Sequence, residues 1–281
     1  MHTNLATSTS TSTALEAPPA GLSPLGLRLL AFAREQLQMA QDHLTRKGED
    51  RHLGIHQARK CIRRTRATLA LGKRVFDKHA ERLDDDLGKL CRGLSALRDS
   101  QALVEELKRL EAVAPEEVMP ILSRAKVAAR QRRDQMLERT LQRDAGLESR
   151  RRRLLLARER LGALDWKSLD ERKVVKAVKR SKRRVEKAAP RAERHPADEE
   201  AWHLYRRRLR RLHQQHTLLA TLQPGLLPAS LGQEARASAL GELQDDALLL
   251  KRCGNHSPFP AELRPALRSI ARERLLKARR A

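Results

Sequence analysis

The chain has 281 residues, enough for one large or two small domains with a hydrophobic core. Lysine and arginine total 59 against 35 acidic residues, so the formal net charge of +24 indicates a polyanionic partner: nucleic acid, an anionic membrane surface or inorganic polyphosphate. Three phenylalanines, two tryptophans and one tyrosine give bases little to stack on. This composition disfavours single-stranded nucleic acid, although it does not exclude binding to a duplex backbone.

The predicted elements are all helical. Residues 1–24 form a Ser/Thr/Pro-rich tail that we expect to be disordered. Apolar spacing and helix-breaking residues then predict helices at about 25–46, 53–78, 80–111, 116–143, 147–162, 169–189, 199–223, 230–252 and 262–280. No segment has the two-residue period of a strand, so we predict an all-α fold of two antiparallel helical bundles. The domain spans 25–281, with a first helical half at about 25–165 and a second at about 166–281.

One segment has an unusual charge pattern. Residues 54–66 read GIHQARKCIRRTR, and as a helix they carry only cations on the polar face, because no position from 54 to 76 is acidic. A solvated helix normally mixes acids and bases at four-residue spacing, since like charges repel there. We therefore interpret this face as the binding surface for an external anion. Its candidate residues are His56, Arg59, Lys60, Arg63, Arg64 and Arg66.

The same pattern recurs at 201–213, AWHLYRRRLRRLH, shifted by 147 residues. A second motif follows each copy, LSALRD at 94–99 and LGELQD at 240–245. Two motifs in one order at nearly one spacing predict an internal duplication, in which each half contributes a basic helix. The candidate residues of the second copy are His203, Arg206, Arg207, Arg210 and Arg211.

A third cationic helix is predicted at 169–189. Its cations recur every three or four residues, but Glu186 interrupts them. The face is therefore either a further part of the site or an ordinary solvated surface. The candidate residues here are Lys179, Arg180 and Arg183.

The acidic residues near these motifs give little indication of catalysis or metal binding. Asp99 and Asp245 are either catalytic carboxylates or bridges to arginine on a neighbouring helix. We favour bridges, because an acid paired with cations is a poor general base. Residues 84–86 are three consecutive aspartates, which point about 100° apart on a helix and cannot easily converge on one metal ion; we interpret them as an acidic first turn. Without a phosphate-binding glycine loop or a positioned nucleophile, we predict no catalytic residue, metal or cofactor, and no enzymatic activity.

These motifs resemble those of the CHAD family, the conserved histidine α-helical domain. HxxRKxxRRxR at 56–66 with LRD at 97–99 is similar to its first half, and HxxRRxxRR at 203–211 with LGELQD is similar to its second. The resemblance covers about 25–280 and implies two bundles related by a pseudo-two-fold axis around a basic central groove or pore that binds inorganic polyphosphate. The chain departs from the family at His213-Gln214, where Arg-Tyr is usual. It also lacks the ExExK strand of the CYTH triphosphatase domain that is fused to some members, so a stand-alone binding domain is implied.

We therefore expect non-enzymatic binding of inorganic polyphosphate, with attachment to polyphosphate granules; the alternative is a nucleic-acid- or ribosome-associated protein. Arginine suits phosphate because its planar guanidinium presents paired donors and stays charged. Helical spacing places successive groups about 5–6 Å apart, a span that a phosphate chain bridges. A nearby phosphate raises the pKa of a histidine, so His56 and His203 are expected to give pH-sensitive contacts.

The expected location is the cytoplasm. The three cysteines, Cys61, Cys91 and Cys253, are far apart and form no CxxC pair, a pattern typical of a reducing compartment without disulfides or a zinc site. No apolar run approaches the roughly 18 residues of a membrane span. The N-terminus also lacks the basic and apolar regions of a signal peptide.

Overall fold

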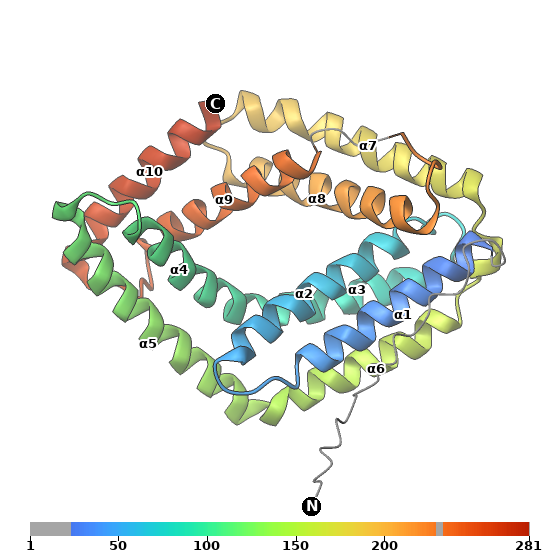
Figure 1. Cartoon of the computed structure of the whole chain (residues 1–281), viewed down its shortest axis with the longest axis horizontal. Helices are drawn as coiled ribbons and strands as arrows, with labels where there is room; N and C mark the ends of the chain where they lie inside the picture. Colours follow the sequence, from blue (N-terminus) through green and yellow to red (C-terminus); the bar gives the residue numbers. More distant parts are fainter. Residues whose placement is uncertain (1–23, 229–232, 281) are drawn as a thin grey trace, which may run out of the picture.

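The structure is a computed structural model that describes residues 24–228 and 233–280. Within these ranges the chain is helical and contains no strand, which confirms the predicted all-α fold (Figure 1). The predicted tail, apart from Pro24, lies outside the described residues. Among the described helices, none combines the length and apolar character needed to cross a membrane. The three cysteines are buried and free.

The α-helices of the described residues follow the predicted order, with one predicted helix divided in two. The first half of the sequence contains α1 (Leu25–His43), α2 (Asp50–Leu69), α3 (Lys78–Gly93), α4 (Ser95–Glu111), α5 (Met119–Arg143) and α6 (Glu148–Gly162). The second half contains, within the described residues, α7 (Glu171–Arg194), α8 (Glu199–Leu222), α9 (Gln233–Arg252) and α10 (Arg264–Arg280).

Three predicted boundaries are wrong. The helix predicted at 53–78 ends at Leu69, and the chain runs through turns from there to the start of α3. The helix predicted at 80–111 is two helices, because the chain turns at Leu94. Leu94 is fully buried, so the apolar stripe continues across the turn and hides it from the sequence pattern. The predicted break at Pro190 does not occur, and α7 continues to Arg194. Proline removes one backbone hydrogen bond, but Pro190 is exposed, so water can satisfy the freed carbonyl.

The three consecutive aspartates are also placed differently from the prediction. They lie in the middle of α3 rather than in its first turn. Asp84 pairs with Arg66 on α2, and Asp86 pairs with Arg160 on α6 at 2.8 Å. Their role is therefore to join α3 to its neighbours through ion pairs.

The helices pack around two hydrophobic clusters. One cluster, which includes Leu107, Leu249 and Leu267, lies among α4, α5, α9 and α10. The larger one, which includes Leu29, Ile62 and Leu209, lies among α1, α2, α7 and α8 and extends to α3 and α6. Figure 1 shows the two groups side by side. Each bundle therefore takes helices from both halves of the sequence, so the bundles do not coincide with residues 25–165 and 166–281.

The two halves of the sequence meet through the helices that carry the repeated motifs. The basic helices α2 and α8 pack together, as do α4 and α9. Across the first contact, the buried Gln215 side chain donates a hydrogen bond to the carbonyl of Ala67 at 3.0 Å. Across the second, Arg98 donates to Asp245 at 3.2 Å. Corresponding motifs thus lie together, but α3 and α6 have no counterpart among the described residues between α7 and α10, and the internal duplication stays a prediction.

Candidate functional site

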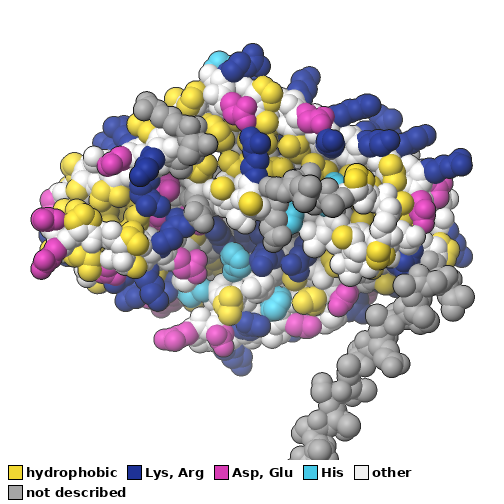
Figure 2. Space-filling model, turned by 45° about the horizontal axis from the view of Figure 1, so that its top comes forward, with side chains coloured by type: hydrophobic (Ala, Val, Ile, Leu, Met, Phe, Trp, Pro, Cys, Tyr) yellow, Lys and Arg dark blue, Asp and Glu magenta, His cyan; other side chains and the backbone are white. Residues whose placement is uncertain are grey.

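A cavity of about 240 Å³ lies where α2, α3 and α8 meet. Figure 2 shows one face of the molecule, with Lys, Arg and His side chains gathered in a hollow at its centre. We call this cavity the central pocket. It is lined by Arg59, Arg63, Arg66, Gly88, Cys91, Arg92, Ser95, His203, Arg207, Arg210, Arg211 and Gln214.

The cations of α2 reach the pocket because the opposite face of the helix is apolar. Ile55 and Ile62 are buried in the larger hydrophobic cluster, at 1% and 0% exposure. Burial of these side chains fixes the rotation of α2 about its axis. The cations at 59, 63 and 66, which lie one helical turn apart, therefore line the pocket together.

The same relation holds for α8. Tyr205 and Leu209 are buried against the larger cluster. The cationic side of α8 is consequently turned toward α2 and α3. It contributes His203, Arg207, Arg210 and Arg211 to the central pocket.

Two of the α2 arginines are bonded within the protein. Arg66 donates from Nε and Nη2 to the two carboxylate oxygens of Asp84, at 2.7 and 2.9 Å. Its guanidinium lies over Gly88, where a Cβ would stand 3.3 Å from the guanidinium carbon. Arg59 donates instead to the hydroxyl of Ser95 at 2.7 Å and to the carbonyl of Cys91. The charge of Arg66 is thus balanced by an acid, whereas Arg59 has neutral partners.

Arg63 and Arg210 carry charges that no acid balances. Within the described residues neither forms an ion pair, and the Nε of Arg63 is buried without a hydrogen-bond partner. Burial and the neighbouring Arg210 lower the pKa of Arg63 to about 9. Burial and Arg206 lower the pKa of Arg210 to about 10. Bringing such charges together without a counter-charge costs free energy, and an anion between them would offset this cost.

Two aspartates and two arginines lie close together where α4 meets α9, beside the pocket. Burial lowers the pKa of Arg206 to about 10, and Asp245 opposes this effect. Asp245 bridges to Arg98 on the neighbouring helix, as predicted. Asp99 lies 3.7 Å from Arg98 of its own helix and also supports the charge of Arg206. Both acids are therefore engaged by arginine.

The two motif histidines occupy different environments. His203 is exposed in the central pocket, with its Nδ1 3.2 Å from Oε1 of Gln244. His56 lines a separate cleft of about 890 Å³ beside α2, α4 and α5. Burial, then Arg98 and Arg63, lower the pKa of His56 to about 4, so this imidazole is neutral in the free protein. Its expected protonation requires an anion that offsets these cations.

Comparison with known proteins gives the family. A model of the CHAD domain matches residues 28–254. The chain belongs to the CHAD family. Polyphosphate binding is a known property of CHAD domains.

Among solved structures, this CHAD domain is similar to "PptA from Streptomyces chartreusis", with a TM-score of 0.62 and 18% sequence identity. The match covers 92% of this chain and 97% of that one. At this identity the likeness shows a shared fold and nothing further. No curated protein matches the sequence.

Several predicted residues of the CHAD domain lie outside the central pocket. Arg64 donates to the Gln36 side chain of α1 at 3.3 Å, and Lys60 is half-buried beside His56. Arg206 lines a small neighbouring cavity between α8 and α9. None of these three residues lines the central pocket.

The predicted cations of α7 are also separate from the pocket. Lys179 and Arg183 are exposed, and Arg180 is half-buried near Arg74 and Arg184. None of the three predicted residues lines the central pocket. Lys179 and Arg183 are therefore exposed outside the central pocket, and the choice between the two interpretations of this face stays a prediction.

Sequence reasoning missed the side of the pocket formed by α3 and the start of α4. Gly88, Cys91, Arg92 and Ser95 line it, together with Gln214 of α8. Most of these residues contribute a backbone carbonyl, a hydroxyl or open space rather than charge. The only sequence signal was Arg92, a cation on the stretch that leads into the LSALRD motif.

Proposed function

We propose that this CHAD domain binds inorganic polyphosphate in the central pocket and does not change it chemically. The observation that carries the proposal is the facing pair Arg63 and Arg210, two half-buried cations of the pocket that form no ion pair within the described residues. A phosphate chain offers charge and oxygen acceptors along its whole length but no apolar surface. Guanidinium groups that lie close together in a recess match this chemistry.

The lining of the pocket favours a phosphate chain over nucleic acid. No aromatic side chain is among the described residues that line it. The aromatic residues of α8, Trp202 and Tyr205, pack against each other with ring centroids 6.3 Å apart, and Tyr205 is buried. Bases would therefore find no stacking surface in the pocket, while phosphates would find donors.

A binding role without turnover is supported by the state of the acids. Asp245 is held by Arg98, and a carboxylate in an ion pair is a weak general base. In the cell, we propose, this binding attaches the protein to polyphosphate granules. Incubation with long-chain polyphosphate should release no orthophosphate; steady release would refute the non-enzymatic proposal.

Calorimetric titration tests the proposal directly. Long-chain polyphosphate, tripolyphosphate and a random-sequence RNA are titrated at a salt concentration near the physiological value of about 0.15 M. The expected result is tight binding of the long chain, with many phosphates per protein, and much weaker binding of RNA. Equal or tighter binding of RNA would instead favour a nucleic-acid-associated function.

A pair of double variants locates the site. Arg63→Glu with Arg210→Glu reverses the facing pair and should abolish binding. Lys179→Glu with Arg183→Glu changes the net charge equally, on the exposed face of α7, and should retain most of the affinity. Circular dichroism checks that both variants are folded. Equal losses in both would mean that total charge, and not the pocket, determines binding.

A further inference from the structure

A second cavity, of about 220 Å³, lies between α7 and α8. It is lined by Ser181, Arg184, Leu204, Arg207, Arg208 and Arg211. Arg207 and Arg211 line the central pocket as well, so the two cavities share a wall of two arginines. The cationic surface therefore continues from the centre of the molecule onto the outside of α7.

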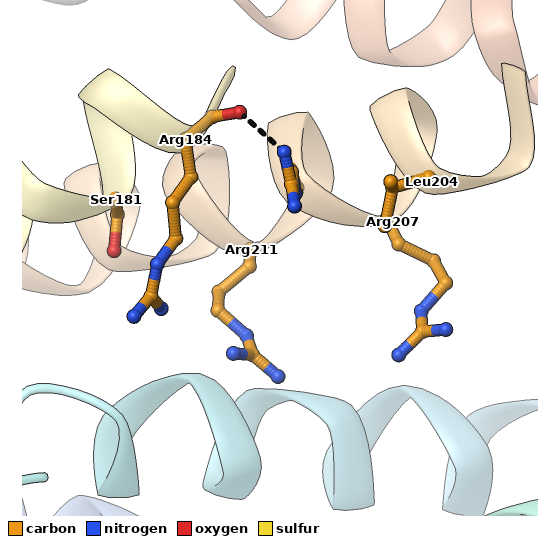
Figure 3. A pocket seen from close by; sticks show the side chains of 6 residues that line it. Ser181, Arg184, Leu204, Arg207 and Arg211 are labelled. Atoms are coloured by element: carbon orange, nitrogen blue, oxygen red, sulfur yellow. Dashed lines mark hydrogen bonds between the residues drawn. The ribbon is translucent and has the colours of Figure 1, made fainter. Parts of the chain in front are cut away.

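The side chains of this second cavity divide into a structural and a free group. Arg208 donates to the backbone carbonyl of Arg184 at 3.0 Å and so ties α8 to α7. The side chain of Arg184 is exposed and forms no ion pair within the described residues. Figure 3 shows it extending in the same direction as those of Arg211 and Arg207. Arg184 thus continues the line of guanidinium groups that begins in the central pocket.

The charges around the central pocket favour a polyanion path toward α7 over a path toward α3. On the side of α3, Asp84 pairs with Arg66, and Asp86 lies on the same helix. The carboxylate of Asp84 therefore occupies one guanidinium group of the pocket on that side. The cavity between α7 and α8 has no acidic side chain among its described lining residues. The nearby acid of α7, Glu186, lies 3.8 Å from Lys182 on the exposed surface.

We propose that the cavity between α7 and α8 is a second phosphate subsite, where a chain held in the central pocket leaves it and is bound by Arg184. This inference rests on the proposed polyphosphate function. It adds a reason why the protein should bind long phosphate chains more tightly than short ones. A short oligophosphate fills the central pocket only, whereas a long chain contacts both sites and gains affinity because its segments are covalently linked.

A matched pair of neighbouring variants tests the subsite. Arg183 and Arg184 are adjacent on α7 and both exposed, but only Arg184 lines the cavity. Arg183→Gln and Arg184→Gln remove the same charge, and each is titrated with long-chain polyphosphate and with tripolyphosphate. We expect Arg184→Gln to weaken binding of the long chain by about three- to tenfold, as for one partly exposed charged contact. Tripolyphosphate affinity should be unchanged, and Arg183→Gln should have little effect on either ligand.

The outcomes separate this inference from the function on which it rests. Equal losses in the two variants would overturn the subsite, since only overall charge would then matter. An equal loss for tripolyphosphate and the long chain in Arg184→Gln would place Arg184 in the central site and also overturn it. Failure of the unaltered protein to bind either polyphosphate would overturn the proposed function together with the subsite.

Discussion

Replacing Arg63 by methionine is expected to stabilise the free protein while weakening its binding of polyphosphate. Methionine keeps an unbranched side chain of similar reach but removes the charge. In the free protein this charge lies beside Arg210, and burial and Arg210 together lower the pKa of Arg63 to about 9. A lowered pKa means that the folded state disfavours the charged form, which is the form present at neutral pH.

The size of the effect follows from the pKa. Each pKa unit corresponds to about 1.4 kcal/mol. The fall in the pKa of Arg63 from the ordinary arginine value of 12.5 to about 9 would therefore correspond to roughly 5 kcal/mol if the charge were fully buried. The guanidinium is partly solvated, and screening reduces this cost to about 1–3 kcal/mol. The free energy of unfolding of Arg63→Met should rise by that amount at neutral pH, less any packing loss.

Urea denaturation with and without polyphosphate measures both effects. Ligand at 100 times its dissociation constant should stabilise the unaltered protein by about 2.7 kcal/mol, and Arg63→Met by much less. Arg66→Met is the control on the same helix. It leaves Asp84 without its bidentate partner and should lower the free energy of unfolding by about 1–3 kcal/mol. If Arg63→Met were destabilised as much as Arg66→Met, the reasoning about unbalanced charge would be refuted.

Three further predictions concern pH, the contact between the halves, and salt. Burial and Asp246 raise the pKa of Glu106 to about 7, so the native state retains a proton that the unfolded chain releases, and stability should fall as pH rises from the ordinary glutamate range to 7. Urea denaturation at pH 5 and pH 8 should show a smaller fall for Glu106→Gln than for the unaltered protein; equal falls would exclude this residue as the cause. Asp245→Asn should lower the free energy of unfolding by about 1–2 kcal/mol, because Arg98 loses the nearer of its two acidic partners, yet tighten polyphosphate binding beside Arg206; weaker binding would contradict a repulsive role for this acid. The logarithm of the affinity should fall by on the order of 0.7–0.9 per logarithm of salt for each phosphate neutralised, and a flat salt titration would exclude an electrostatic site.

The helices and their cationic faces could be predicted because both depend on local periodicity. The spacing of Arg59, Arg63 and Arg66 indicates that they share a face, and the repeat at 201–213 indicates a second such face. No position from 54 to 76 is acidic, so the counter-charge of this face was predicted to come from outside the helix; Asp84 of α3 supplies it for Arg66, while Arg63 forms no ion pair within the described residues. Asp245 was expected to bridge to an arginine, and it does.

The rest depended on packing between distant segments. No local pattern shows that α4 and α5 form a bundle with α9 and α10, because the hydrophobic faces of helices do not specify their partners. For the same reason the sequence did not show that Asp84 lies beside Arg66, or that His56 and His203 occupy different cavities. Arg184 is one residue from Arg183 and equally charged, and only the approach of α8 distinguishes them.

The pairing of the two halves has a consequence for how the chain folds. Gln215 and Ala67 are 148 positions apart, and Arg98 and Asp245 are 147 apart. Contacts of such separation form late, because a long loop must close before they contribute, whereas hairpins such as α1 with α2 form early. Docking of the halves must bring the arginines of α2 and α8 together, so their repulsion opposes the last step of folding. A polyanion that screens this repulsion should speed the step, and polyphosphate would then act on the assembly of the protein as well as on the finished site.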